Sequence, residues 1–147
     1  MGAASGRSTA ETWLVRWAWI SLVLYGGCTL VFLFGRGPLF ATINATGRLF
    51  GLPETPPSTE MFWLALTISM MTMLCVCCVM IGRDVRRNVD FCIPIVFGKI
   101  GGALVGILAF ALWRPYPAHV TIALTDVPMG LVTWVLWSRA RRAIPSG

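Results

Sequence analysis

The chain has 147 residues, of which 56% are hydrophobic and only 12% are charged. A soluble domain averages about 25% charged residues, so the composition excludes an ordinary soluble protein and predicts a single transmembrane domain over residues 1–147. The net charge of +6 does not indicate nucleic-acid binding, because the arginines lie at the ends of apolar runs rather than on one basic face.

Four apolar segments are long enough to cross a bilayer, at residues 13–34, 61–81, 91–113 and 118–137. A hydrocarbon core of ~30 Å needs about 20 helical residues at ~1.5 Å each. Residues 1–12 are small and polar, so we expect a disordered tail there. Ser58 or Thr59 is expected to cap the second segment. The sequence therefore predicts an all-α fold, a transmembrane four-helix bundle.

The long connection between the first two segments has the pattern of a shorter helix that does not cross the membrane. Within residues 38–51, Leu39, Phe40, Ile43 and Phe50 can share one side of a helix, with Arg48 elsewhere. This pattern predicts a short amphipathic helix in the first outer loop, lying on the membrane surface.

The arginines predict the orientation of the segments, because basic residues are retained on the cytoplasmic side. With both termini inside, the cytoplasmic arginines are Arg7, Arg16, Arg83, Arg86, Arg87, Arg139, Arg141 and Arg142, and the outer ones are Arg36, Arg48 and Arg114. This bias predicts a multi-pass protein with both termini cytoplasmic, and we expect a bacterial inner membrane as its location.

Two opposite charges, unlike Arg16 near the end of its segment, lie deep inside apolar segments. Lys99 is the only charge in the third segment, and Asp126 is the only acid within an apolar run. Counting along neighbouring antiparallel helices places them at depths that differ by ~4–5 Å, so the sequence predicts an intramembrane ion pair. By the same count, the supporting polar layer contains Tyr25, Ser69 and Thr72. The pair is either a structural lock between two helices or part of a site for a proton, an ion or a polar ligand.

Three glycines of the third segment recur at every fourth residue. Gly98, Gly102 and Gly106 form a small-residue stripe, against which another helix backbone can pack closely. The stripe predicts a packing face, and the partner helix can belong to this chain or to another one.

Five cysteines lie within or beside the apolar segments. Cys75 and Cys78 share a helix face, and Cys92 follows across a short turn. Such thiols suit a thiophilic metal ion or redox chemistry, but cysteine also serves as a compact apolar residue. We favour the packing role and expect no metal site and no cofactor.

In length, in topology with the N-terminus inside and in its long first outer loop, the chain resembles the small four-helix bacterial membrane proteins of the DoxX-like type. The resemblance implies a four-helix membrane bundle and no particular functional residue.

The function expected from these features is that of a non-catalytic integral membrane accessory or scaffold protein in a larger membrane assembly. Its partners would be the lipid bilayer and a membrane protein or a second copy of itself, with no nucleic acid. The alternative is a small transporter or ligand-binding bundle that uses the Lys99–Asp126 layer. A thiol-dependent metal or redox protein is the least favoured of the three, and no catalytic residue is predicted.

Overall fold

The computed structural model describes residues 6–56 and 61–144. The described chain is helical and contains no strand: α1 is Thr9–Phe34, α2 is Arg36–Arg48, α3 is Met61–Arg83, α4 is Val85–Asn88, the 3-10 turn η1 is Val89–Phe91, α5 is Cys92–Leu112 and α6 is Pro117–Ala143. Ser58 and Thr59, the expected caps of α3, lie outside the described residues. The all-α prediction is confirmed.

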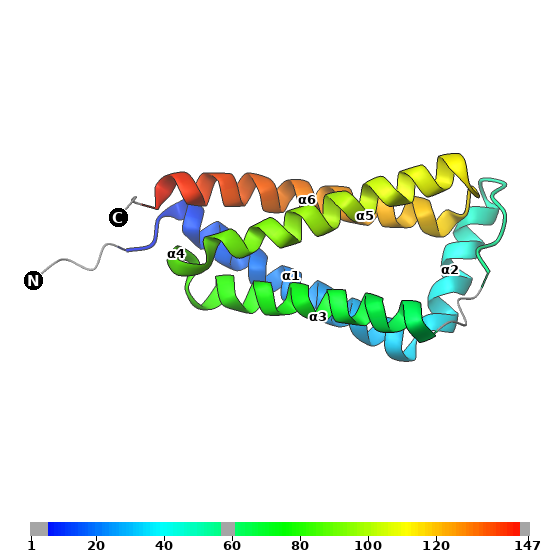
Figure 1. The fold of residues 1–147 in the computed structure, drawn as a ribbon, viewed down its shortest axis with the longest axis horizontal. Coiled ribbons are helices and arrows are strands. Elements are labelled where there is room, and N and C mark those ends of the chain that lie inside the picture. The colour runs from blue at the N-terminus through cyan, green and yellow to red at the C-terminus, as the bar shows by residue number, and fades with distance from the viewer. Residues whose placement is uncertain (1–5, 57–60, 145–147) are drawn as a thin grey trace, which may run out of the picture.

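Four of these helices are long enough and apolar enough to cross a membrane, namely Thr9–Phe34, Met61–Arg83, Val85–Leu112 (which joins α4, η1 and α5) and Pro117–Ala143. By the length and composition of these helices, the chain is a multi-pass membrane protein. The four helices run alternately up and down, and the start of α1 and the end of α6 lie at the same end of the bundle as α4 (Figure 1).

The start of α1 corrects the prediction of a disordered tail for residues 8–12, while residues 1–5 lie outside the described residues. Ser8 is the N-cap, its Oγ accepts from the Glu11 N–H at 3.2 Å, and Glu11 Oε2 accepts from the Ser8 N–H at 2.5 Å. This capping box satisfies N–H groups that the first helical turn otherwise leaves free, so α1 begins before the apolar run does.

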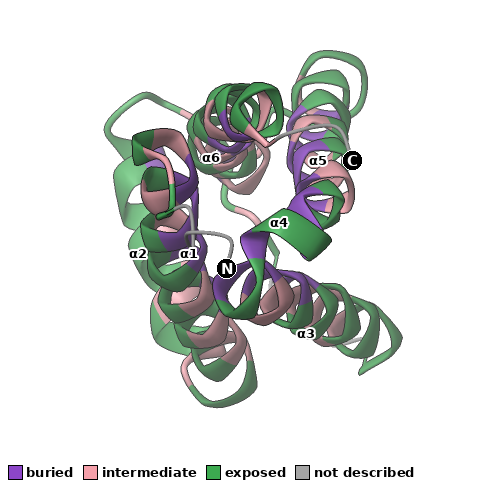
Figure 2. Ribbon diagram, turned by 90° about the vertical axis from the view of Figure 1, so that its left-hand side faces the viewer, coloured by how far each residue is buried: buried purple, intermediate pink, exposed green. Residues whose placement is uncertain are grey.

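The helices associate in two pairs. The most extensive contact joins α5 to α6, the next joins α1 to α3, and α1 also packs on α6. Figure 1 shows α3 and α5 meeting near α4 and diverging toward the opposite end, where α2 lies. Viewed from the end that carries the termini, the buried residues of α1, α3 and α5 face the middle of the bundle (Figure 2).

The apolar core lies near α4. Its buried members are Leu14, Val15, Ala18, Tyr25, Leu74, Cys77, Cys78, Ile81, Val85, Val89, Cys92, Ile95 and Ala140. No residue of α1 after Tyr25 and none of α3 before Leu74 is buried. The two helices α1 and α3 are therefore buried only in their halves near α4, and their halves toward α2 are not buried.

The connection after α2 is fixed to the bundle. The Asn44 side chain donates to the Thr55 carbonyl at 3.0 Å and accepts from the Thr55 N–H at 2.9 Å. A Cβ atom on Gly47 would come within 2.6 Å of Pro117 Cγ, so α2 rests closely on the first residue of α6. The helix thus has a defined place against the start of α6.

Candidate functional site

The two intramembrane charges lie across the interface of α5 and α6. Lys99 Nζ donates to Asp126 Oδ1 at 2.8 Å. Lys99 is buried, and 17% of the Asp126 side chain is exposed. Opposite charges attract strongly in surroundings of low dielectric, and together the two residues carry no net charge into the bundle.

Glycines let α5 and α6 approach closely around this pair. A Cβ atom on Gly102 would lie 2.9 Å from Asp126 Oδ2, and one on Gly106 would lie 2.9 Å from the backbone carbonyl oxygen of His119. On α6, a Cβ atom on Gly130 would lie 2.8 Å from Ile100 Cδ1. The acidic side chain therefore occupies the space that Gly102 leaves free.

Gly98 does not share this contact, because a Cβ atom there would meet nothing within 4 Å. Residues four apart on an α-helix with 3.6 residues per turn are offset by ~40°, so the eight residues from Gly98 to Gly106 turn the stripe by ~80°. Gly102 and Gly106 consequently face α6, while Gly98 does not.

A third helix contributes Tyr25 to the site. Lys99 Nζ lies 4.9 Å from the centroid of the buried Tyr25 ring, within the range of a cation–π contact. The Tyr25 hydroxyl finds no hydrogen-bond partner among the described residues, and neither does the hydroxyl of Ser21, one turn earlier on the same face of α1. Two buried hydroxyls on one face of α1, that of Tyr25 beside Lys99 and that of Ser21 one turn away, thus have no partner among the described residues, and an unpaired buried group costs ~1–3 kcal/mol.

The other two residues of the expected layer lie elsewhere. Ser69 and Thr72 are both exposed on α3, and the Thr72 hydroxyl donates to the Ile68 carbonyl of its own helix at 2.8 Å. The buried face of α3 is set by Leu74, Cys77, Cys78 and Ile81. Ser69 and Thr72 fall outside that face, so the structure does not bring them to the layer around Lys99.

The cysteines are distributed between the core and the surface. Cys77, Cys78 and Cys92 are buried in the apolar core, Cys75 is half-buried and Cys28 is exposed, and all five are free thiols. Within the described ranges, no three His, Cys, Asp or Glu side chains gather closely enough to hold a metal ion. In this arrangement Cys78 and Cys92 pack as small apolar residues between α3 and α5.

Sequence reasoning missed two polar contacts near the end that carries the termini. Arg86 Nε donates to the buried carboxylate of Glu11 at 2.6 Å, which ties α4 to the first turn of α1. Trp17 Nε1 donates to Thr133 Oγ1 at 2.9 Å and ties α1 to α6. Ser21 was missed as well, although its four-residue spacing from Tyr25 on α1 places it on the same face and was the signal that could have found it.

Comparisons of the chain with protein-family models, with curated proteins and with solved structures found no match. The likeness to DoxX-like proteins therefore rests on length and topology alone, and it stays a prediction. What the molecule does has to be inferred from its own residues.

Proposed function

We propose that this membrane protein is a non-catalytic accessory or scaffold subunit that packs within a larger membrane assembly. The observation that carries the proposal is the unequal packing of the bundle. Toward α2, residues 26–34 of α1 and 61–73 of α3 contain no buried residue. Membrane helices gain stability by close packing against other helices, and these two half-helices have a large surface left for such packing.

Open glycines support the proposal. A Cβ atom on Gly26 or Gly27 of α1, or on Gly98 or Gly101 of α5, would meet nothing within 4 Å. Where a glycine does have a neighbour, as at Gly106, the contact is close. An open glycine on a membrane helix provides a place where a helix of another chain can approach to backbone distance.

The electrostatics of the bundle agree with a structural role. Lys99 and Asp126 neutralise each other, and their contact fixes which faces of α5 and α6 meet. Glu11 and Arg86 do the same between α1 and α4. Buried ion pairs of this kind are best attested as devices that specify one arrangement of helices.

We further propose that both termini lie in the cytoplasm of a bacterial cell and that the chain resides in the inner membrane. The start of α1 and the end of α6 lie at the same end of the bundle as α4 (Figure 1), and this end carries most of the arginines, including Arg83, Arg87 and Arg139. The α2 end carries Arg36, Arg48 and Arg114. With this orientation α2 becomes the surface helix of the first outer loop.

Co-purification from native membranes tests the accessory role. We expect the parent chain in a mild detergent to recover a membrane protein or a second copy of itself. We expect Gly27→Leu or Gly101→Leu to lower that recovery at least tenfold without lowering the melting temperature, because a Cβ atom at either position would meet no atom of the described residues within 4 Å. Val105→Leu is the matched control, since Val105 is already an exposed apolar residue of α5. Equal recovery by the parent and both glycine variants would contradict the proposal.

A second candidate function is a small transporter or ligand-binding bundle. It is favoured by the Tyr25 hydroxyl, whose ring contacts Lys99, and by the Ser21 hydroxyl one turn earlier on α1, both of which have no hydrogen-bond partner among the described residues. A polar ligand, an ion or ordered water could bind these groups. Tyr25→Phe distinguishes this candidate from the first, because it removes one of these hydroxyls and keeps the aromatic ring.

A further inference from the structure

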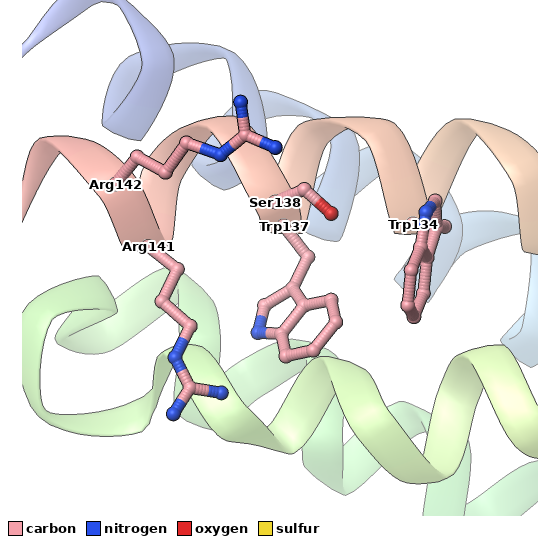
Figure 3. Close-up of a pocket in the computed structure, with 5 residues that line it drawn as sticks. All are labelled: Trp134, Trp137, Ser138, Arg141 and Arg142. Atoms are coloured by element: carbon pink, nitrogen blue, oxygen red, sulfur yellow. The ribbon is translucent and has the colours of Figure 1, made fainter.

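A hollow of about 350 Å³ opens on the last turns of α6, away from the Lys99–Asp126 site. Its lining residues are Trp134, Trp137, Ser138, Arg141 and Arg142 (Figure 3). It lies at the end of the bundle that carries the termini, which is the cytoplasmic end in the orientation proposed above. The two tryptophans and two arginines bring together the side chains that membrane proteins place at the bilayer surface.

The spacing of these residues explains why they share one side of α6. Trp134, Ser138 and Arg142 are four residues apart in turn, and Trp137 and Arg141 are also four apart, so each set forms a row along the helix. Along the ~12 Å of α6 from Trp134 to Arg142, an indole is followed by a hydroxyl and then by a guanidinium group. A phospholipid has the same order, from the upper acyl chain through the glycerol to the phosphate.

The aromatic part of the hollow is held in place by its neighbours. The rings of Trp134 and Trp137 lie 5.1 Å apart, and the Arg141 guanidinium carbon lies 5.5 Å from the Trp137 ring. Arg141 also pairs with Asp90 of η1 at 3.0 Å. Figure 3 shows Trp134, Trp137 and Arg141 projecting to the same side of α6. The hollow therefore has an ordered wall of indoles with a guanidinium at its rim.

One guanidinium of the hollow has no partner among the described residues, and a protein-covered indole N–H in its wall has none either. Trp137 Nε1 is buried without a hydrogen bond. Arg142 makes no hydrogen bond or ion pair with residues 6–56 or 61–144, and its guanidinium reaches along α6 toward Ser138 (Figure 3). Arginine binds phosphate oxygens through its planar fork of N–H groups, and the Ser138 hydroxyl can donate to the same anion.

We propose that this hollow binds the phosphodiester headgroup of an anionic phospholipid. Arg142 and Ser138 contact the phosphate. Arg141, which forms an ion pair with Asp90, lies beside the phosphate. The two indoles flank the glycerol. The ligand is a lipid rather than a soluble phosphate because the hollow continues into lipid-facing surface: Leu131 and Val135 of α6 are exposed apolar residues next to Trp134. This inference depends on membrane insertion and is independent of the accessory role.

Binding to the purified full chain in nanodiscs tests the proposal. The discs contain phosphatidylcholine with or without phosphatidylglycerol, and the melting temperature is measured over a titration of the anionic lipid. We expect phosphatidylglycerol to stabilise the parent chain. Arg142→Gln should weaken the apparent lipid affinity about tenfold, which is the loss expected for one charge-assisted hydrogen bond. Trp137→Phe should weaken it less, because Trp137 Nε1 is covered by protein and the variant keeps an aromatic, though smaller, ring in the wall.

Arg139→Gln is the matched control, since Arg139 is an exposed arginine of the same helix end and does not line the hollow. We expect it to keep the affinity of the parent. Equal losses in Arg139→Gln and Arg142→Gln would mean that only surface charge attracts the lipid, and would overturn the proposal. Glycerol 3-phosphate in solution forms the second arm: if it stabilises the chain in phosphatidylcholine discs as strongly as the lipid does, the site binds soluble phosphate and the lipid assignment is wrong.

Discussion

Lys99 Nζ and Asp126 Oδ1 lie 2.8 Å apart, although 27 residues separate them in sequence. The pair joins two apolar helices at a point where Gly102 leaves room for the carboxylate and Tyr25 covers the ammonium group. Three helices thus converge on one neutralised pair of charges. The contribution of the Lys99–Asp126 pair to the free energy of unfolding can be measured without an assay of activity.

Removing one member of the pair should destabilise the bundle. Lys99→Met leaves a partly buried carboxylate without its cation, and Asp126→Leu leaves a buried ammonium group, each at a cost of up to ~3–5 kcal/mol. The double variant leaves no unpaired charge, so we expect its loss to be much smaller than the sum. A double-mutant cycle on unfolding in detergent measures this coupling. Strictly additive losses would show that the two charges do not stabilise each other.

A methyl group at Gly106 should separate α5 from α6. The added Cβ would lie 2.9 Å from the His119 carbonyl oxygen, a backbone atom that cannot rotate away, so we expect Gly106→Ala to cost ~1–3 kcal/mol. Gly101→Ala on the same helix meets nothing within 4 Å and should be neutral or slightly stabilising, because alanine favours the helix. Thermal unfolding of the two variants side by side provides the measurement. Equal melting temperatures would mean that α5 and α6 are not in close contact at Gly106.

Removing the Tyr25 hydroxyl separates the two candidate functions. Tyr25→Phe keeps the ring over Lys99 and removes a buried hydroxyl that has no protein partner, so the accessory role predicts unchanged or raised stability. Ser21→Ala should behave in the same way. If a ligand or an ion binds these hydroxyls, both variants should instead lose stability or ligand-dependent stabilisation. Melting temperatures of chain purified from native membranes decide between the two results.

The proposed orientation can be read from single cysteines added to the parent chain. Arg139→Cys and Glu54→Cys suit this purpose because both residues are exposed and neither lies in the core. We expect an impermeant maleimide to label Glu54→Cys in intact cells and Arg139→Cys only after lysis, with the parent chain as control for its own thiols. Labelling of Arg139→Cys alone in intact cells would reverse the orientation.

Much of the fold could be predicted because bilayer thickness, helix rise and short turns restrict the possible structures. The segment at 91–113 corresponds to α5 at Cys92–Leu112, and the short turn before α6 makes these two helices neighbours. Counting residues along the helices then gives the depth of Lys99 and Asp126. Counting does not give the rotation of a helix about its axis. For this reason Ser69 and Thr72 were expected in the polar layer, whereas the rotation of α3 leaves both residues exposed.

The polar contacts at the end of the bundle that carries the termini were not predictable in the same way. Glu11 precedes the first apolar segment and Arg86 lies 75 residues later in the charged turn between the second and third, and in both places hydrophobic periodicity gives no information about neighbours. Their contact follows from the tertiary packing of α4 against the start of α1. The hollow around Arg142 likewise depends on side-chain conformations, which the four-residue spacing permits but does not determine.

Photo-crosslinking within native membranes tests the central claim most directly, namely that the open faces of this bundle pack against another membrane protein. Leu30 and Leu104 suit a photoreactive residue, because each is a large exposed side chain within one turn of an open glycine, Gly27 or Gly101. The accessory role predicts a discrete protein adduct from at least one of these positions, containing either another membrane protein or a second copy of the chain, and its loss when Gly27→Leu or Gly101→Leu is added. Adducts to lipid alone from both positions would contradict it.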